Sequence, residues 1–190
     1  TFGIFFIGIL SMVATAELLL YKKNVHPEFV RKFVHVLVGI LVSTCPFIFE
    51  SNLPPMALAG IFIVVNFLSL KSGKLKGMHS TDRVTYGTVY FPIAFLILAT
   101  FFWEKPITLI LSMLVMSLSD TATGISGSKA DHPRIFTLWK DSKTLEGSTV
   151  MFLTTFLIVY VGTDFFAWIF GAAFFIPLPN LISLAGFVAM

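Results

Sequence analysis

Long apolar runs are the feature that most constrains how this chain folds. Seven runs and the start of an eighth fill most of the sequence, at residues 2–20, 33–49, 55–70, 86–102, 107–118, 148–161 and 165–176, and from Leu181 onward. Inside lipid the backbone must satisfy its own hydrogen bonds, so only helices and closed barrels cross a membrane. A barrel strand alternates apolar and polar residues over about ten positions, and these runs do not. Only 12% of the residues are charged, against roughly 25% in soluble domains. We therefore expect an all-α, polytopic transmembrane helix bundle of about seven or eight helices.

The lengths and ends of the runs predict a single transmembrane domain over residues 1–190. The runs at 107–118 and 165–176 are shorter than the roughly 20 residues that a span needs, so we expect them to extend into their polar flanks or to lie inside the bundle. Most prolines fall at run edges, where helices start or stop, whereas Pro92 lies inside a run and predicts a kink. The chain starts without Met and stops inside an apolar run, so we expect both ends to be truncated.

Basic residues predict the orientation of the bundle. If the runs cross the bilayer alternately, the connections at 21–32, 71–85 and 120–147 lie on one side, and they hold twelve of the thirteen Lys and Arg residues. The exception is Lys105. Cytoplasmic loops are enriched in Lys and Arg, so the three connections are predicted to face the cytoplasm, and the protein is predicted to be a multi-pass integral membrane protein.

Two totals exclude further classes of function. The single Cys45 cannot form an internal disulfide, and it makes a cysteine-built metal site improbable. The formal net charge is only +3, which is too small for the basic surface of a nucleic-acid-binding protein. We expect no nucleic-acid partner, and the oligomeric state stays open.

The connection at 120–147 holds most of the polar residues of the chain. If the preceding helix continues past Leu118, then Asp120, Thr123 and Gly127 share one helical face, with Gly124 beside them. Small residues let phosphate groups approach the backbone. A carboxylate on such a surface can hold Mg²⁺, which binds through one or two carboxylates together with phosphate oxygens.

The end of the same connection adds cations and a helix start. Lys140 and Lys143 precede Glu146 and Gly147, which open the run at 148–161. The first N–H groups of a helix attract phosphate. We therefore expect Asp120 and Glu146 to face each other across a basic cleft, which Lys129, Lys140 and Lys143 form. A solvated loop whose lysines only fix the topology is the alternative.

The start of the second run contributes Arg31 and His35. These residues are four apart and share a helical face, with His35 about one turn inside the apolar run. An ionisable group in a span faces the protein interior and needs a partner, so we expect phosphate or Asp120 beside His35. Arg31 and Lys32 also fit an ordinary topology signal.

These elements together resemble a known family. Arg31-Lys-x-x-His35, Ser119-Asp120-x-x-x-Gly124-x-x-Gly127 and Lys143-Thr-Leu-Glu-Gly-Ser148 resemble the CTP-dependent lipid kinases, namely dolichol kinase, phytol kinase and the yeast-type diacylglycerol kinase. The resemblance covers roughly residues 28–160. The last two elements also look like those of phosphatidate cytidylyltransferases, whose C-terminal Gly-Asp-Arg-Asp type signature this chain lacks.

The resemblance implies a kinase that transfers the γ-phosphoryl group of CTP to the hydroxyl of a lipid alcohol, such as a polyprenol, phytol or diacylglycerol. By resemblance, Asp120 holds Mg²⁺, and Glu146 is a second metal ligand or the general base. Arg31 and His35 line the mouth of the site, and Lys143 is catalytic. The implied nucleotide-binding residues are Thr123, Gly124, Gly127, Lys129, Lys140, Lys143, Thr144 and Gly147.

Three other functions stay open. A cytidylyltransferase would release pyrophosphate and form a CDP-lipid. A small transporter is suggested by Glu17, His35 and Asn66 inside apolar runs, although the polar residues cluster on one side of the membrane. A purely structural membrane subunit would leave the polar connection at 120–147 unexplained.

Overall fold

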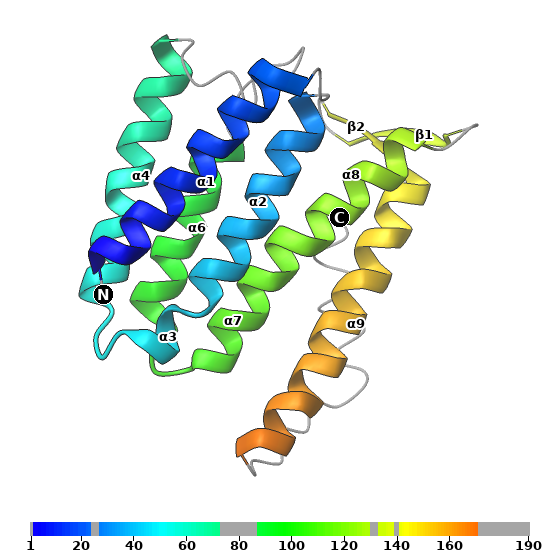
Figure 1. The fold of residues 1–190 in the computed structure, drawn as a ribbon. Helices are drawn as coiled ribbons and strands as arrows, with labels where there is room; N and C mark the ends of the chain where they lie inside the picture. The colour runs from blue at the N-terminus through cyan, green and yellow to red at the C-terminus, as the bar shows by residue number, and fades with distance from the viewer. Residues whose placement is uncertain (1, 24–26, 73–86, 130–132, 139–140, 171–190) are drawn as a thin grey trace. The chain divides into compact units, whose positions relative to one another are not determined.

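A computed structural model describes residues 2–23, 27–72, 87–129, 133–138 and 141–170 of the chain, and side chains are described for most of these (Figure 1). The helices are α1 (Phe2–Lys23), α2 (Pro27–Ser43), α3 (Cys45–Ile48), α4 (Leu53–Ser72), α6 (Gly87–Phe101), α7 (Pro106–Leu114), α8 (Asp120–Lys129) and α9 (Leu145–Phe170), with a π-helical turn η1 (Val115–Ser119) between α7 and α8. Strands β1 (Ile135–Leu138) and β2 (Asp141–Thr144) form an antiparallel hairpin. The expected helical architecture is therefore confirmed, with one small hairpin added.

Five stretches are long and apolar enough to cross a membrane. They are Phe2–Leu19, Glu28–Ile48, Leu53–Lys71, Pro106–Gly127 and Leu145–Ile169, and α6 is a shorter apolar helix. These lengths are those of a multi-pass membrane protein. The expectation of seven or eight helices is wrong for the described part of the chain, which contains six apolar helical stretches. The eighth run, from Leu181, lies outside the described residues.

The count differs because the runs at 148–161 and 165–176 begin within one helix, α9. The sequence suggests a break at Gly162-Thr163-Asp164, but the Thr163 hydroxyl donates to the carbonyl oxygens of Val159 at 2.7 Å and Tyr160 at 2.9 Å. A threonine that bonds to its own helix adds no unpaired group. Asp164 lies on the exposed side of α9, so the helix continues through both polar residues.

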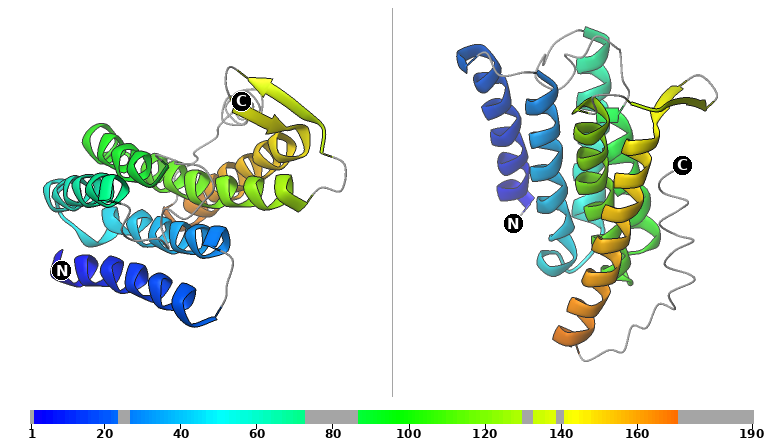
Figure 2. Two further views of the ribbon diagram at one scale, coloured as in Figure 1. Left: turned by 90° about the horizontal axis from the view of Figure 1, so that it is seen from above. Right: turned by 90° about the vertical axis from the view of Figure 1, so that its right-hand side faces the viewer.

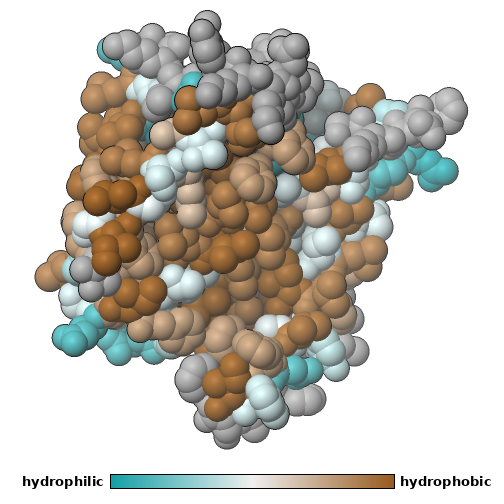
Figure 3. All heavy atoms as spheres, in the orientation of Figure 1, coloured by the Kyte–Doolittle hydropathy of each residue, from teal (hydrophilic) through white to brown (hydrophobic). Residues whose placement is uncertain are grey.

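The chain divides into two compact units, Thr1–Leu109 and Ile110–Met190. In the first unit, α1 packs along α2, and α4 packs along α6 (Figure 2). The contact between α1 and α2 is a small apolar core made by Val13, Ala16, Val30 and Val34. Figure 3 shows apolar side chains over most of α1 and α2 on the face in view, and Ile4 and Ile7 of α1 are 76% and 66% exposed. Exposed apolar helices of this kind suit a lipid surrounding.

A side-chain hydrogen bond compensates for Pro92 inside α6. Proline has no N–H, so the carbonyl four residues earlier, that of Thr88, loses its helical donor. The amide of Asn66 on α4 donates to this oxygen at 2.8 Å. Neighbouring helices commonly satisfy backbone groups that a proline frees in a membrane. The helix therefore continues across Pro92, and Asn66 joins α4 to α6.

In the second unit, the backbone runs from α7 through η1 into α8 without a break. After the hairpin the chain returns as α9, which packs along η1 and α8, and the hairpin lies at the end of this helix pair (Figures 1 and 2). Much of the segment that we expected as a connection, residues 120–147, is therefore helix and hairpin. The connection expected at 21–32 is also shorter, because α1 ends at Lys23 and α2 begins at Pro27.

Candidate functional site

The π-helical turn η1 leads directly into Asp120, the first residue of α8. Ser117 and Ser119 of this turn are fully buried. The hydroxyl of Thr155 on α9 donates to that of Ser119 at 3.3 Å, so the turn is joined to α9 by a buried polar contact. Asp120 itself is exposed. Turns of this type are rare and are often found at functional sites, and the sequence carries no signal for one here.

The Thr144 hydroxyl organises the start of α9. It accepts a hydrogen bond from the Gly147 N–H at 3.1 Å, which is the usual N-cap interaction. A Cβ atom added at either Gly127 or Gly147 would lie 2.9 Å from this oxygen. The two glycines therefore let α8, the end of β2 and α9 approach closely.

Thr123 completes this contact on the α8 side. Its hydroxyl donates to the Ser119 carbonyl at 2.7 Å and lies 3.2 Å from the Met151 sulfur on α9. A Cβ at Gly147 would also lie 3.4 Å from the Thr123 methyl group. The structure thus brings together Thr123, Gly127, Thr144 and Gly147, four of the residues that we expected to bind nucleotide.

Glu146 contacts the backbone of the hairpin. Both of its carboxylate oxygens accept from the N–H of Arg134, at 3.2 and 3.3 Å. In return, the Leu145 N–H donates to the Arg134 carbonyl at 3.0 Å. Residue 134 is therefore held to the first turn of α9 through both of its backbone polar groups.

The lysines of the candidate site are described to different extents. Lys143 lies on β2 opposite Phe136, and its side chain is exposed. Lys129 ends α8, but its side chain lies outside the described residues, as does all of Lys140. The basic cleft therefore stays a prediction. Gly124 lies inside α8, where helical N–H groups bond to the carbonyl four residues earlier.

Arg31 and His35 belong to the first unit, and Arg31 pairs with Glu28, a carboxylate that we did not expect at the site. Glu28 accepts from Arg31 through two hydrogen bonds, at 2.7 Å from Nη2 and 3.1 Å from Nε. The Lys32 ammonium lies 3.6 Å from the same carboxylate, and Lys32 is only 8% exposed. The spacing of Glu28 from both cations is the signal that could have identified it.

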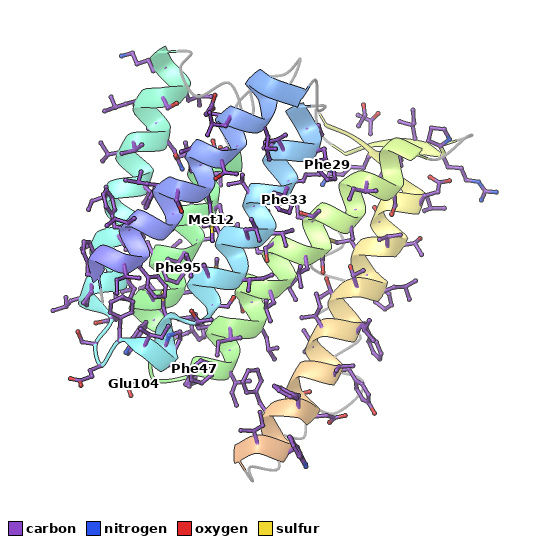
Figure 4. The ribbon with its side chains drawn as sticks, viewed as in Figure 1. Met12, Phe29, Phe33, Phe47, Phe95 and Glu104 are labelled. Atoms are coloured by element: carbon purple, nitrogen blue, oxygen red, sulfur yellow. The ribbon has the colours of Figure 1, made fainter. Side chains whose placement is uncertain are left out.

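His35 packs by its ring. The imidazole makes an edge contact with Phe91 of α6, with 4.4 Å between ring centroids. On α2, the helix that carries His35, the rings of Phe29 and Phe33 stack one turn apart with 6.4 Å between their centroids, and both side chains are exposed (Figure 4). The start of α2 thus carries two exposed phenylalanine rings as well as its cations.

The described residues contain no group of three or more His, Cys, Asp and Glu side chains that could hold a metal ion. Mg²⁺ does not need such a cage when it is bound with a nucleotide, because phosphate oxygens fill the other positions. An exposed carboxylate such as Asp120, beside a close-packed glycine and threonine surface, fits that mode of binding.

Comparisons with known proteins give a distant relationship. A probable chloroplastic phytol kinase of Triticum aestivum is 24% identical over 175 residues, which are 85% of this chain and 57% of the relative. The chloroplastic phytol kinase 1 of Arabidopsis thaliana is 27% identical over 164 residues, 80% of this chain and 53% of the relative. The chain is a distant homologue of plant phytol kinases.

The alignment with these phytol kinases includes most of both compact units, but the chain spans only about half the length of the relatives. No protein-family model matches the chain, and no solved structure matches it. The resemblance that the three sequence elements indicate is thus confirmed at the level of distant homology.

Proposed function

We propose that the protein is a membrane-embedded kinase that transfers the γ-phosphoryl group of CTP to the hydroxyl of a lipid alcohol of the prenol class. The observation that carries this proposal is the homology to two phytol kinases over 80–85% of the chain. The elements around Arg31, Asp120 and Lys143 occur in the order expected for CTP-dependent lipid kinases, which supports CTP as the nucleotide.

The proposed chemistry requires mainly positioning and neutralisation of charge. The oxygen of the alcohol attacks the γ-phosphorus, the bond from this phosphorus to the β,γ-bridging oxygen breaks, CDP leaves, and the hydroxyl proton passes to a base. Mg²⁺ bound at Asp120 would neutralise phosphate charge. Lys143 on the hairpin binds phosphate oxygens, with Lys129 and Lys140 as further cations.

Thr123, Thr144 and the glycines of α8 and α9 provide the small-residue surface against which the triphosphate lies. The Thr144 cap and the Gly127 and Gly147 contacts support this role, because they keep bulky side chains away from the start of α9. For Arg31 and His35, a place at the mouth of the site stays a prediction from the resemblance.

A location in the membrane suits a substrate with a long apolar tail. The second unit has an apolar groove of about 420 Å³ between α7, η1 and α9, which Leu114, Leu118, Leu157 and Phe165 help to line. The prenol tail stays in the apolar phase, while its hydroxyl reaches the basic face, which we place in the cytoplasm by the positive-inside rule.

The test is an assay of purified protein in detergent or nanodiscs, with Mg²⁺, labelled CTP or ATP, and a panel of phytol, polyprenol, diacylglycerol and phosphatidate. We expect lipid monophosphate and CDP from a prenol. Asp120→Asn should lose most of this activity, whereas the matched control Asp164→Asn, which alters an exposed carboxylate on α9, should keep it.

Each alternative gives a different product. Pyrophosphate with a CDP-lipid from phosphatidate would establish the cytidylyltransferase, and nucleotide-independent flux into liposomes would establish a transporter. Equal activity of wild type and Asp120→Asn would refute the site assignment while leaving the reaction in place.

A further inference from the structure

We propose that Glu146 is a positioning residue, whose carboxylate fastens the β1–β2 hairpin to α9 and thereby fixes the place of Lys143. This inference rests on the proposed function, since it concerns how that site holds its nucleotide. It differs from the role expected from the resemblance, in which Glu146 is a metal ligand or the general base.

The first support is the set of hydrogen bonds at the base of the hairpin. Both oxygens of Glu146 accept the Arg134 N–H, and the Leu145 N–H donates to the Arg134 carbonyl. The residue before β1 is therefore clamped to the first turn of α9 from both sides. A carboxylate in the first turn of a helix is also favoured by the helix dipole.

The second support is the exposure of strand β1. Two-stranded hairpins are marginally stable by themselves in water. The described side chains of β1 are exposed, with Ile135 65% and Phe136 38% accessible. Among the described residues, β2 contacts α9, and the residue before β1 is joined to α9 through the Glu146 carboxylate and the Leu145 N–H.

The third support is the register that connects the clamp to Lys143. Ile135 pairs with Thr144, and Phe136 pairs with Lys143. Lys143 therefore lies in the second pair beyond Arg134, on the strand that ends in the Thr144 cap. If the clamp opens, β1 can slip or separate from β2, and Lys143 loses its fixed place. Misplacement of a binding group by about 1 Å can lower a rate by roughly 10²-fold.

Removing the charge of Glu146 should have different effects if Glu146 holds the hairpin and if it is a metal ligand or the general base. Glutamine keeps an acceptor oxygen at the same reach, so Glu146→Gln preserves the bond to Arg134, whereas Glu146→Ala removes it. Loss of a general base costs roughly 10² to 10⁴-fold in rate whichever substitution removes it. If Glu146 acts instead by holding the hairpin to α9, Glu146→Gln should retain activity to within about tenfold, because a neutral acceptor replaces a charged one.

The experiment compares Glu146→Gln, Glu146→Ala, Lys143→Ala and the double variant Glu146→Ala/Lys143→Ala by kcat and KM for CTP. Glu50→Ala is the control, since it removes an exposed carboxylate of the first unit. We expect Glu146→Ala to act mainly by raising KM for CTP. In the Lys143→Ala background it should have little further effect, because the residue acts through Lys143.

Amide hydrogen exchange of the peptide that covers residues 133–138 is measured on the same variants and needs no activity. We expect faster exchange in Glu146→Ala, with Glu146→Gln and Glu50→Ala close to wild type. If the wild type shows no CTP-dependent activity, the proposed function fails. The exchange measurement alone then tests whether Glu146 holds the hairpin to α9.

Unchanged exchange in Glu146→Ala would overturn the proposal whatever the kinetics are. A Glu146→Gln variant that is as inactive as Glu146→Ala, with exchange like that of wild type, would assign Glu146 to the metal or to proton transfer instead.

Discussion

The contact of Thr144 with Gly127 and Gly147 allows a double-variant prediction at the start of α9. The Thr144 hydroxyl caps the helix, and a Cβ at Gly147 would lie 2.9 Å from its oxygen and 3.4 Å from the Thr123 methyl group. Thr144 cannot easily turn away, because β-branched side chains have few rotamers and its hydroxyl would lose the hydrogen bond from the Gly147 N–H.

The magnitudes follow from these contacts. Gly147→Ala overpacks the site at about 1–3 kcal/mol and gains about 0.5–1 kcal/mol from reduced backbone entropy in the unfolded chain. The net effect is a loss of roughly 0.5–2 kcal/mol. Thr144→Ala removes the cap at about 1 kcal/mol. In the double variant the cap is lost but the overpacking is relieved, so the total loss should be close to zero, well below the sum of the single losses.

The free energy of unfolding is measured by SDS titration or thermal unfolding of the detergent-solubilised protein. Gly60→Ala on α4 is the matched control, because no atom lies within 4 Å of its added Cβ, and it should be neutral or slightly stabilising. Losses that add to within about 0.5 kcal/mol, or a Gly147→Ala variant as harmless as Gly60→Ala, would refute the packing argument.

Three further substitutions test contacts of single side chains in the same unfolding assay. Glu28→Ala leaves two neighbouring cations without their carboxylate and should cost roughly 1–3 kcal/mol, with Glu28→Gln costing less; equal stability of Glu28→Ala and wild type would contradict this. Thr155→Val should cost about 1 kcal/mol, because it leaves a buried Ser119 hydroxyl unpaired, and adding Ser119→Ala should recover part of the loss. Asn66→Leu should cost roughly 0.6–1.7 kcal/mol of unfolding free energy. In a Pro92→Ala background, residue 92 again donates to the Thr88 carbonyl, so the loss should be smaller, and an equal loss would contradict the role of this carbonyl.

The apolar runs predict most of the helices, because a span in lipid depends mainly on composition and length. They do not predict the continuity of α9. The Gly162-Thr163-Asp164 segment is polar enough to suggest a turn, but the Thr163 hydroxyl is satisfied by its own helix. A composition-based interpretation cannot distinguish such self-satisfied groups from groups that need water.

The local structure around the candidate site could be predicted in part from the sequence. The Lys143–Ser148 element predicts a helix start with small residues, and the structure adds that Thr144 caps it and that Glu146 bonds to Arg134. The π-helical turn could not be predicted, because it is associated with the contact between Ser119 and Thr155, which are 36 residues apart. Glu28 could have been identified from its spacing to Arg31, which fits one turn of helix.

The bond from Asn66 to the Thr88 carbonyl has a consequence for how the protein enters the membrane. A segment that inserts alone would lack the hydrogen bond that joins the Asn66 amide of α4 to the Thr88 carbonyl of α6, and lipid offers no replacement for it. The helix α6 has 15 residues, about 22 Å at 1.5 Å per residue, and is short for a solitary span. We therefore expect the two helices to leave the translocon as a hairpin, with this bond fixing their relative depth, since a slip by one turn would expose both polar groups to hydrocarbon.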